Sequence, residues 1–174
     1  MLRVASLLSV VVAVMLAGKA ISAQDKYTVQ VPNGLAFSEF RGYENWEVVS
    51  VSLAEDVMAV ILANPVMIEA YKSGIPGNGK PFPDGSKTAK IHWKLKKSTD
   101  APAPTSVPDV LHDVDFMVRD SKRFANTNNW GYAQFNYDAA SDAFAPEGTG
   151  SDCGAACHTL VTAKDYVFTA YQKK

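Results

Sequence analysis

The alternation of apolar and polar residues predicts an antiparallel β-sheet as the main element of this chain. In residues 88–96, Ala89, Ile91, Trp93 and Leu95 alternate with polar residues that are mostly lysines. Such a period of two is typical of a strand with one apolar face. Alternation or short apolar runs predict further strands at residues 46–53, 57–62, 112–119 and 130–137.

The predicted helices are few and short. Asn64 and Pro65 suit the start of a helix and Gly74 suits its end, which predicts a helix over residues 65–73. A helical turn is expected at residues 120–126, and residues 159–172 look helical. Stretches rich in glycine or proline predict loops at residues 74–85 and 98–108. The expected fold class is therefore mainly β, or α+β, with an antiparallel sheet and a few short helices.

The N-terminus has the pattern of a secretory signal peptide. Arg3 is followed by an apolar run over residues 4–17, and small residues follow around Ala20 and Ala23. A single-pass anchor is the alternative, but the run is shorter than the roughly 18–20 residues that a spanning helix needs. We predict a cleaved signal peptide over residues 1–23, a single domain over residues 24–174, and a periplasmic protein with no membrane attachment after cleavage.

Charge adds little to this picture. The net charge is −1, and removal of residues 1–23 takes away Arg3 and Lys19 but no acidic residue. A slightly acidic domain lacks the basic surface that nucleic-acid binding requires, so no nucleic-acid partner is expected.

The chain has only two cysteines, Cys153 and Cys157, and His158 follows the second directly. Two thiols followed by a histidine are typical of covalently attached haem c, in which the thiols bond the vinyl groups and the imidazole binds the iron. Three residues separate these cysteines instead of the usual two. A disulfide remains an alternative, as does a zinc site completed by His92 or His112.

Several short motifs, in this order, resemble those of the cytochrome P460 family of periplasmic haem proteins, which includes the cytochromes c′-β. The resemblance extends over residues 37–171. The motifs that carry it are Tyr43-Glu44-Asn45-Trp46, Phe82-Pro83-Asp84-Gly85, Asp120-Ser121-Lys122-Arg123-Phe124-Ala125-Asn126, the cysteine motif at 153–158, and Asp165-Tyr166-Val167-Phe168-Thr169.

The resemblance implies a mostly antiparallel sheet, a homodimer, and one five-coordinate haem c with His158 as the iron ligand. Some members oxidise hydroxylamine and carry a lysine whose nitrogen is bonded to the porphyrin; by similarity this is Lys90. Such a bond needs a neutral amine, which burial favours. The alternative for Lys90 is a solvated charge on an exposed strand face.

Members that oxidise hydroxylamine also place a carboxylate over the open face of the haem, and the matching position is Asp115. A base beside the iron is chemically sensible because oxidation of N–H and O–H bonds releases protons. The alternative is a solvent-facing acid at a strand end. On a strand, Met117 shares the face of Asp115 while Phe116 points the other way, so Met117 is a candidate sixth iron ligand or, alternatively, core filling.

The leading hypothesis is an oxidoreductase that converts hydroxylamine to nitrous oxide or nitric oxide, with Asp115 as proton acceptor and an external cytochrome as electron acceptor. A nitric-oxide-binding protein without turnover is the second hypothesis, and an electron-transfer cytochrome is the third.

Overall fold

The structure, a computed structural model, describes residues 23–32, 34–147 and 151–172, with only the backbone for residues 151–153. The signal peptide predicted over residues 1–23 lies outside the described residues except for Ala23. Among the helices that the structure does describe, none is long and apolar enough to cross a membrane.

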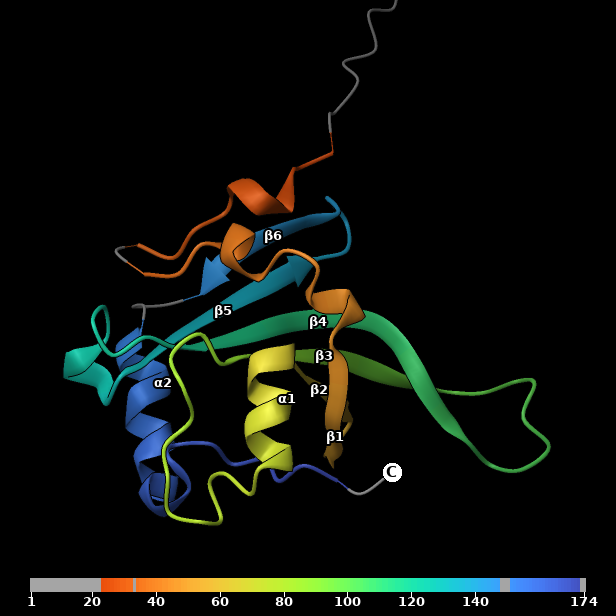
Figure 1. Ribbon diagram of the computed structural model, residues 1–174. Helices are drawn as coiled ribbons and strands as arrows, with labels where there is room; N and C mark the ends of the chain where they lie inside the picture. Colours follow the sequence, from red (N-terminus) through yellow and green to blue (C-terminus); the bar gives the residue numbers. More distant parts are fainter. Residues whose placement is uncertain (1–22, 33, 148–150, 173–174) are drawn as a thin grey trace, which may run out of the picture.

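A six-stranded antiparallel sheet forms the body of the protein (Figure 1). Neighbouring strands are consecutive in sequence, so the sheet is a simple meander. This confirms the fold class predicted from the alternation pattern. The strands are β1 (Glu47–Ala54), β2 (Val57–Ala63), β3 (Lys87–Lys97), β4 (Ser106–Arg119), β5 (Trp130–Asp138) and β6 (Ala143–Glu147).

The N-terminal part of the domain covers one face of the sheet. It contains three short 3₁₀ turns, η1 (Lys26–Thr28), η2 (Phe37–Phe40) and η3 (Tyr43–Asn45). The buried ring of Phe37 lies 5.1 Å from the ring of Phe116 and 4.9 Å from that of Phe135, measured between centroids. Figure 1 shows this segment, in orange, above the sheet.

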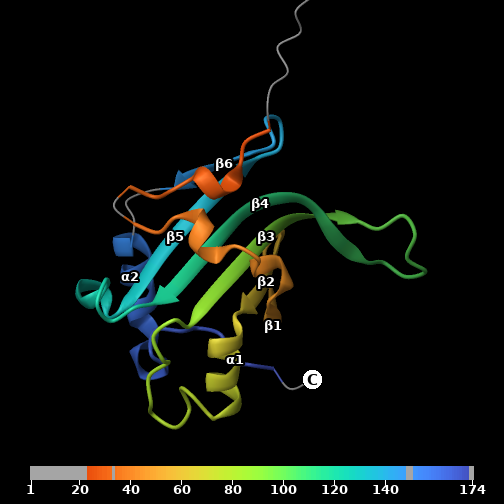
Figure 2. The ribbon, with the colours of Figure 1, turned by 45° about the horizontal axis from the view of Figure 1, so that its top comes forward.

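The opposite face carries the two α-helices, α1 (Pro65–Lys72) and α2 (Ser151–His158), as Figures 1 and 2 show. Helix α1 begins as predicted, because the Asn64 side chain accepts a hydrogen bond from the Met67 amide at 3.1 Å. It buries Met67, Ile68 and Tyr71 in a second apolar cluster. The sheet is thus enclosed between two apolar layers, and the second layer lies beside the functional site.

One predicted boundary was wrong, and one strand was not predicted. Residues 98–108 were expected to form a loop, but β4 starts at Ser106, and β3 and β4 form a long hairpin that projects from the body (Figure 2). Residues 141–152 were not assigned a strand, yet β6 lies there. Its Pro146 obscures the strand pattern and is tolerated because β6 is an edge strand.

The helix expected over residues 159–172 was also wrong beyond Lys164. A 3₁₀ segment, η5 (Thr159–Lys164), is followed by Asp165 and Tyr166, both with positive φ angles of 49° and 63°. Two consecutive left-handed residues end any right-handed helix. In contrast, the helical turn expected at residues 120–126 is present, since the Phe124 amide donates to the Asp120 carbonyl at 3.0 Å.

Candidate functional site

A cavity of about 650 Å³ lies on the helix-bearing face of the sheet, bounded by β1 to β6, α2 and the C-terminal segment. Its volume falls in the range of about 300–1,000 Å³ that is typical of small-molecule and cofactor sites. Apolar groups make up much of its wall, including Ile61, Met117, Tyr132, Val167 and Phe168. The predicted site residues Lys90, Asp115, Cys157 and His158 all line this one cavity.

His158 is the last residue of α2, and its ring is held from three sides. Its Nδ1 atom lies 2.5 Å from the Tyr166 carbonyl oxygen, which can only accept, so Nδ1 carries the proton. The ring centroid is 4.8 Å from that of Tyr132 and 4.8 Å from that of Phe168. This arrangement leaves Nε2 as the metal-binding nitrogen, which is the usual way in which a protein orients a histidine ligand.

Burial lowers the pKa of His158; the hydrogen bond to Tyr166 opposes this effect and the charge of Lys90 adds to it. The lowered pKa favours the neutral imidazole, and the neutral form is the one that binds metals.

The Tyr166 carbonyl is positioned by the left-handed pair Asp165 and Tyr166. The Asp165 carboxylate accepts a hydrogen bond from the Phe82 amide at 2.8 Å, and Arg119 lies 3.4 Å from its other oxygen. Sequence reasoning missed this role for Asp165 and Tyr166, although both belong to a motif that carried the family resemblance.

Gly154 allows α2 to lie directly against β5. A Cβ atom added at Gly154 would stand 2.4 Å from Cγ of Tyr132, closer than side-chain atoms approach one another. Small residues between the two cysteines therefore serve the packing of α2 on Tyr132. Cys157 is exposed and lines the cavity. The predicted thioether at Cys153 lies outside the described side chains.

Lys90 and Asp115 face each other across the β3–β4 pair, since they are register partners and both line the cavity. Met117 lines it as well. The ring of Phe116 stacks instead on that of Phe40 on the other face, with centroids 4.1 Å apart. The predicted shared face of Asp115 and Met117 is thus present.

Burial raises the pKa of Asp115 to about 6, and the neighbouring Asp113 carboxylate adds to the rise, while His92 and Lys90 oppose it. Its Oδ1 atom is buried without a hydrogen-bond partner among the described residues. A half-buried carboxyl that titrates near neutral pH is suited to accept and release protons.

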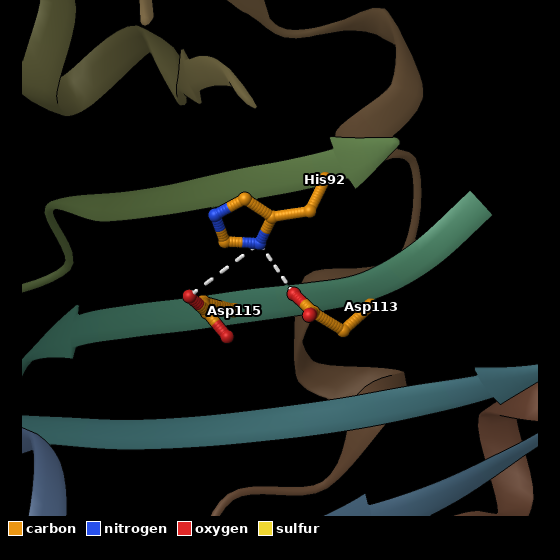
Figure 3. A group of neighbouring side chains, drawn as sticks. All are labelled: His92, Asp113 and Asp115. Carbon is orange, nitrogen blue, oxygen red and sulfur yellow. Dashed lines mark hydrogen bonds and ion pairs between the residues drawn. The ribbon is translucent and has the colours of Figure 1, made fainter. Parts of the chain in front are cut away.

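Among the described residues, no group of three or more potential metal ligands joins His92 or His112 to Cys157, as the zinc alternative requires. Both imidazoles contact the Asp113 carboxylate, and His92 also lies near Asp115 (Figure 3). The group of side chains that could hold a metal ion in the described part of the chain is His92, Asp113 and Asp115, and it contains no cysteine.

Together these residues fit a haem. The cavity offers apolar walls for a porphyrin, an oriented imidazole for the iron and a thiol at its edge. Asp115 contributes an unpaired buried oxygen from the sheet side of the cavity.

Comparison with known proteins agrees with the resemblance. Residues 40–169 match the family model described as Cytochrome P460. No curated protein matches the chain.

Proposed function

The chain belongs to the cytochrome P460 family, and on this premise we propose that it is an exported haem c protein that oxidises hydroxylamine in the cavity beside His158. One observation carries the proposal: Lys90, Asp115, Cys157 and His158, which come from two strands and one helix, line the same cavity. If Lys90 were a solvated surface cation and Asp115 a solvent-facing acid, we would not expect both side chains to line the same cavity as His158.

In this proposal His158 binds the iron through Nε2, and Cys153 and Cys157 bond the porphyrin. Apolar side chains, including Ile61 and Val167, enclose it. When bound, the haem would supply an iron able to take electrons from the substrate, and an external cytochrome would be the electron acceptor.

Asp115 handles the protons. Oxidation of hydroxylamine to nitric oxide or nitrous oxide breaks N–H and O–H bonds, so the protons need an acceptor close to the substrate. The ionised Asp115 carboxylate is that acceptor, and its pKa of about 6 allows it to be ionised at neutral pH yet able to hold a proton. Lys90, opposite Asp115 in the β-ladder, is the residue bonded to the porphyrin.

The first test is the optical spectrum of the reduced protein. If Lys90 is bonded to the ring, the Soret band is strongly red-shifted in the wild type and returns to an ordinary haem c position in Lys90→Leu. Lys94→Leu is the matched control, because Lys94 lies on the same strand but is exposed. An ordinary spectrum in the wild type would remove the cross-link.

The second test is covalent attachment. Denatured wild-type protein should retain haem in mass spectrometry, and denatured Cys157→Ser should lose it. Release of haem from the denatured wild type would contradict attachment through either thiol.

The third test is steady-state hydroxylamine oxidation. Asp115→Asn should reduce the rate by roughly 10²- to 10⁴-fold, the usual contribution of a general base. Asp109→Asn is the control, since Asp109 pairs with Lys96 at the surface of the same strand. An unchanged rate in Asp115→Asn would exclude a proton-transfer role.

Binding of nitric oxide without turnover is the second candidate, and the apolar side chains of Ile61, Met117 and Val167 in the cavity favour it. It predicts an ordinary haem c spectrum, tight nitric oxide binding and no hydroxylamine turnover. Iron ligation by Met117, which would indicate an electron carrier, predicts a six-coordinate spectrum that becomes five-coordinate in Met117→Leu.

We also propose that the protein is a periplasmic homodimer. The edge strand β1 exposes Val51 and Leu53, which would be covered in a dimer. Sedimentation of the purified protein tests the dimer, and N-terminal sequencing of the exported protein tests cleavage of the leader.

A further inference from the structure

Four side chains that line the cavity form a row across strands β3 to β6. Lys90 pairs with Asp115, Asp115 with Gln134, and Gln134 with Glu147 in the register of the sheet. All four line the cavity. Side chains at paired positions of an antiparallel sheet lie on the same face, with Cβ atoms about 4.5–5.5 Å apart. The Gln134 amide therefore lies beside the Asp115 carboxyl group in the cavity wall.

A short series of hydrogen bonds sets the orientation of the Gln134 amide. The Nδ2 atom of Asn136 contacts the Glu147 carboxylate. Since a carboxylate only accepts, Asn136 turns its nitrogen toward Glu147 and its oxygen toward Gln134. This oxygen accepts a hydrogen bond from Gln134 Nε2 at 3.2 Å. The carbonyl oxygen of Gln134, Oε1, is consequently the end of the amide that does not bond to Asn136.

Two acceptor oxygens are thus available in this part of the cavity wall. Gln134 Oε1 has no hydrogen-bond partner in the part of the chain that the structure describes. Asp115 Oδ1 is buried and also lacks a partner there, although the Asp115 side chain as a whole is 34% exposed. Acceptors without donors favour a ligand that carries hydrogens on its own nitrogen or oxygen atoms.

This chemistry separates two classes of small haem ligand. Hydroxylamine has N–H and O–H groups, so it can donate to Asp115 Oδ1 and to Gln134 Oε1. Nitric oxide and carbon monoxide have no hydrogen and would leave both oxygens without a partner, which costs binding free energy once water is excluded. A site that offers hydrogen-bonding groups discriminates against ligands that cannot use them.

We propose that Gln134 is a substrate-orienting residue whose carbonyl oxygen accepts a hydrogen bond from hydroxylamine, while Asn136 and Glu147 hold the amide in place. This role rests on the proposed function, because it names the group that holds the substrate of that reaction beside Asp115. The Gln134 amide takes up no proton. Its contribution is to the affinity for hydroxylamine and to the preference for hydroxylamine over ligands without hydrogen.

Ligand binding without turnover tests this role. Hydroxylamine is titrated into the oxidised haem protein with no electron acceptor present, carbon monoxide is titrated into the reduced protein, and the haem spectrum is followed. Gln134→Met removes the amide at nearly constant side-chain length. Its Kd for hydroxylamine should be raised about 3- to 10-fold, as expected for the loss of one neutral hydrogen bond. Its Kd for carbon monoxide should not rise.

Two further variants separate orientation from packing. Asn136→Leu removes the hydrogen bonds that hold the amide but leaves Gln134 itself in place. It should raise the Kd for hydroxylamine by less than Gln134→Met does. Gln30→Met is the matched control, because it makes the same substitution at an exposed glutamine that does not line the cavity. It should leave the Kd values of both ligands unchanged.

Steady-state kinetics give a second readout. Gln134→Met should raise the KM for hydroxylamine with little change in kcat, whereas loss of the Asp115 base should lower kcat. An unchanged Kd for hydroxylamine in Gln134→Met would overturn the role of Gln134. An equal rise in the Kd values for hydroxylamine and carbon monoxide would also overturn it, because Gln134 would then serve only the packing of the cavity.

The two proposals fail in different ways. If the wild type binds hydroxylamine with an affinity that depends on Gln134 but does not oxidise it, the proposed function fails and the role of Gln134 stands. If the wild type oxidises hydroxylamine and Gln134→Met retains the wild-type Kd and KM, the role of Gln134 is wrong and the function stands.

Discussion

The Asp165 carboxylate accepts a hydrogen bond from the Phe82 amide, with Oδ2 and the amide nitrogen 2.8 Å apart. This contact joins the loop between α1 and β3 to the left-handed turn whose next residue, Tyr166, orients His158. The position of the candidate iron ligand therefore depends on a residue remote from the cysteine motif.

We predict that Asp165→Ala changes the properties of the haem without touching it. Loss of the anchor should loosen the Tyr166 carbonyl, weaken its hydrogen bond with His158 and make the imidazole a poorer electron donor. The reduction potential of the iron should become more positive, and the free energy of unfolding should fall by about 1–3 kcal/mol, since the Phe82 amide loses its partner. Spectroelectrochemistry and urea unfolding measure the two effects.

Asp109→Ala is the control for Asp165→Ala, because it removes a surface carboxylate paired with Lys96. It should change neither quantity appreciably. If Asp165→Ala lowers stability but leaves the potential at the wild-type value, Asp165 is only structural.

Gly154→Ala should be destabilising even though alanine favours helices. Alanine would gain up to about 1 kcal/mol in helix propensity over glycine. The added Cβ would stand 2.4 Å from Cγ and 2.5 Å from Cβ of Tyr132, near the backbone of β5, where the ring cannot turn away. Overpacking of this kind costs about 1–3 kcal/mol. Chemical unfolding should show a net decrease in the free energy of unfolding, and haem incorporation in cells should decrease.

Ala156→Ser is the control for Gly154→Ala, since Ala156 is exposed on the same helix. The double variant Gly154→Ala with Tyr132→Ala should recover α2 packing relative to Tyr132→Ala alone. A stable Gly154→Ala protein with full haem content would show that α2 does not rest on Tyr132.

The strands and α1 could be predicted because their signals are local. The alternation in residues 88–96 and the Asn64-Pro65 start each act within a few residues of sequence, and both appear in the structure. Strand β6 and the end of the 159–172 segment could not be predicted in this way. Strand β6 depends on pairing with β5, and the turn at Asp165 depends on a contact with Phe82.

Some residues of the candidate site could likewise be predicted from the sequence, and others could not. The cysteine motif predicts His158 as a site residue, and the family resemblance predicts Lys90 and Asp115, which the β3–β4 register brings together. The roles of Tyr166 and Gln134 had no sequence signal of their own. The first arises from a backbone carbonyl, and the second from the pairing of β4 with β5.

Asn64 should contribute more to stability than a helix cap alone. Its Oδ1 atom accepts from the amides of Met67 and Lys87, at 3.1 and 3.0 Å, and its Nδ2 donates to the Gly85 carbonyl at 2.8 Å. It therefore fixes both the start of α1 and the start of β3. Asn64→Ala should lower the free energy of unfolding by about 2 kcal/mol, toward the upper end for cap residues, with an unchanged denaturant slope. Asn64→Asp retains the acceptor and should lose less; equal losses would assign the effect to the Nδ2 contact alone.

Asp115 should make the protein less stable as the pH rises through the acidic range. Its pKa is about 6 in the folded protein against an ordinary 3.8, so the folded state holds the proton more tightly than the unfolded chain. Below both values the carboxyl is protonated in both states, and its stabilising contribution is complete. As the pH rises, the Asp115 carboxyl of the unfolded chain ionises first, and this stabilising contribution decreases until the carboxyl of the folded protein has also ionised.

The side chain of Asp115→Asn cannot ionise, so the melting temperature of this variant relative to the wild type should increase between about pH 4 and about pH 7. Asp109→Asn, at the surface, should follow the wild type; if Asp115→Asn does the same, the carboxyl group of Asp115 is solvated and does not have a raised pKa.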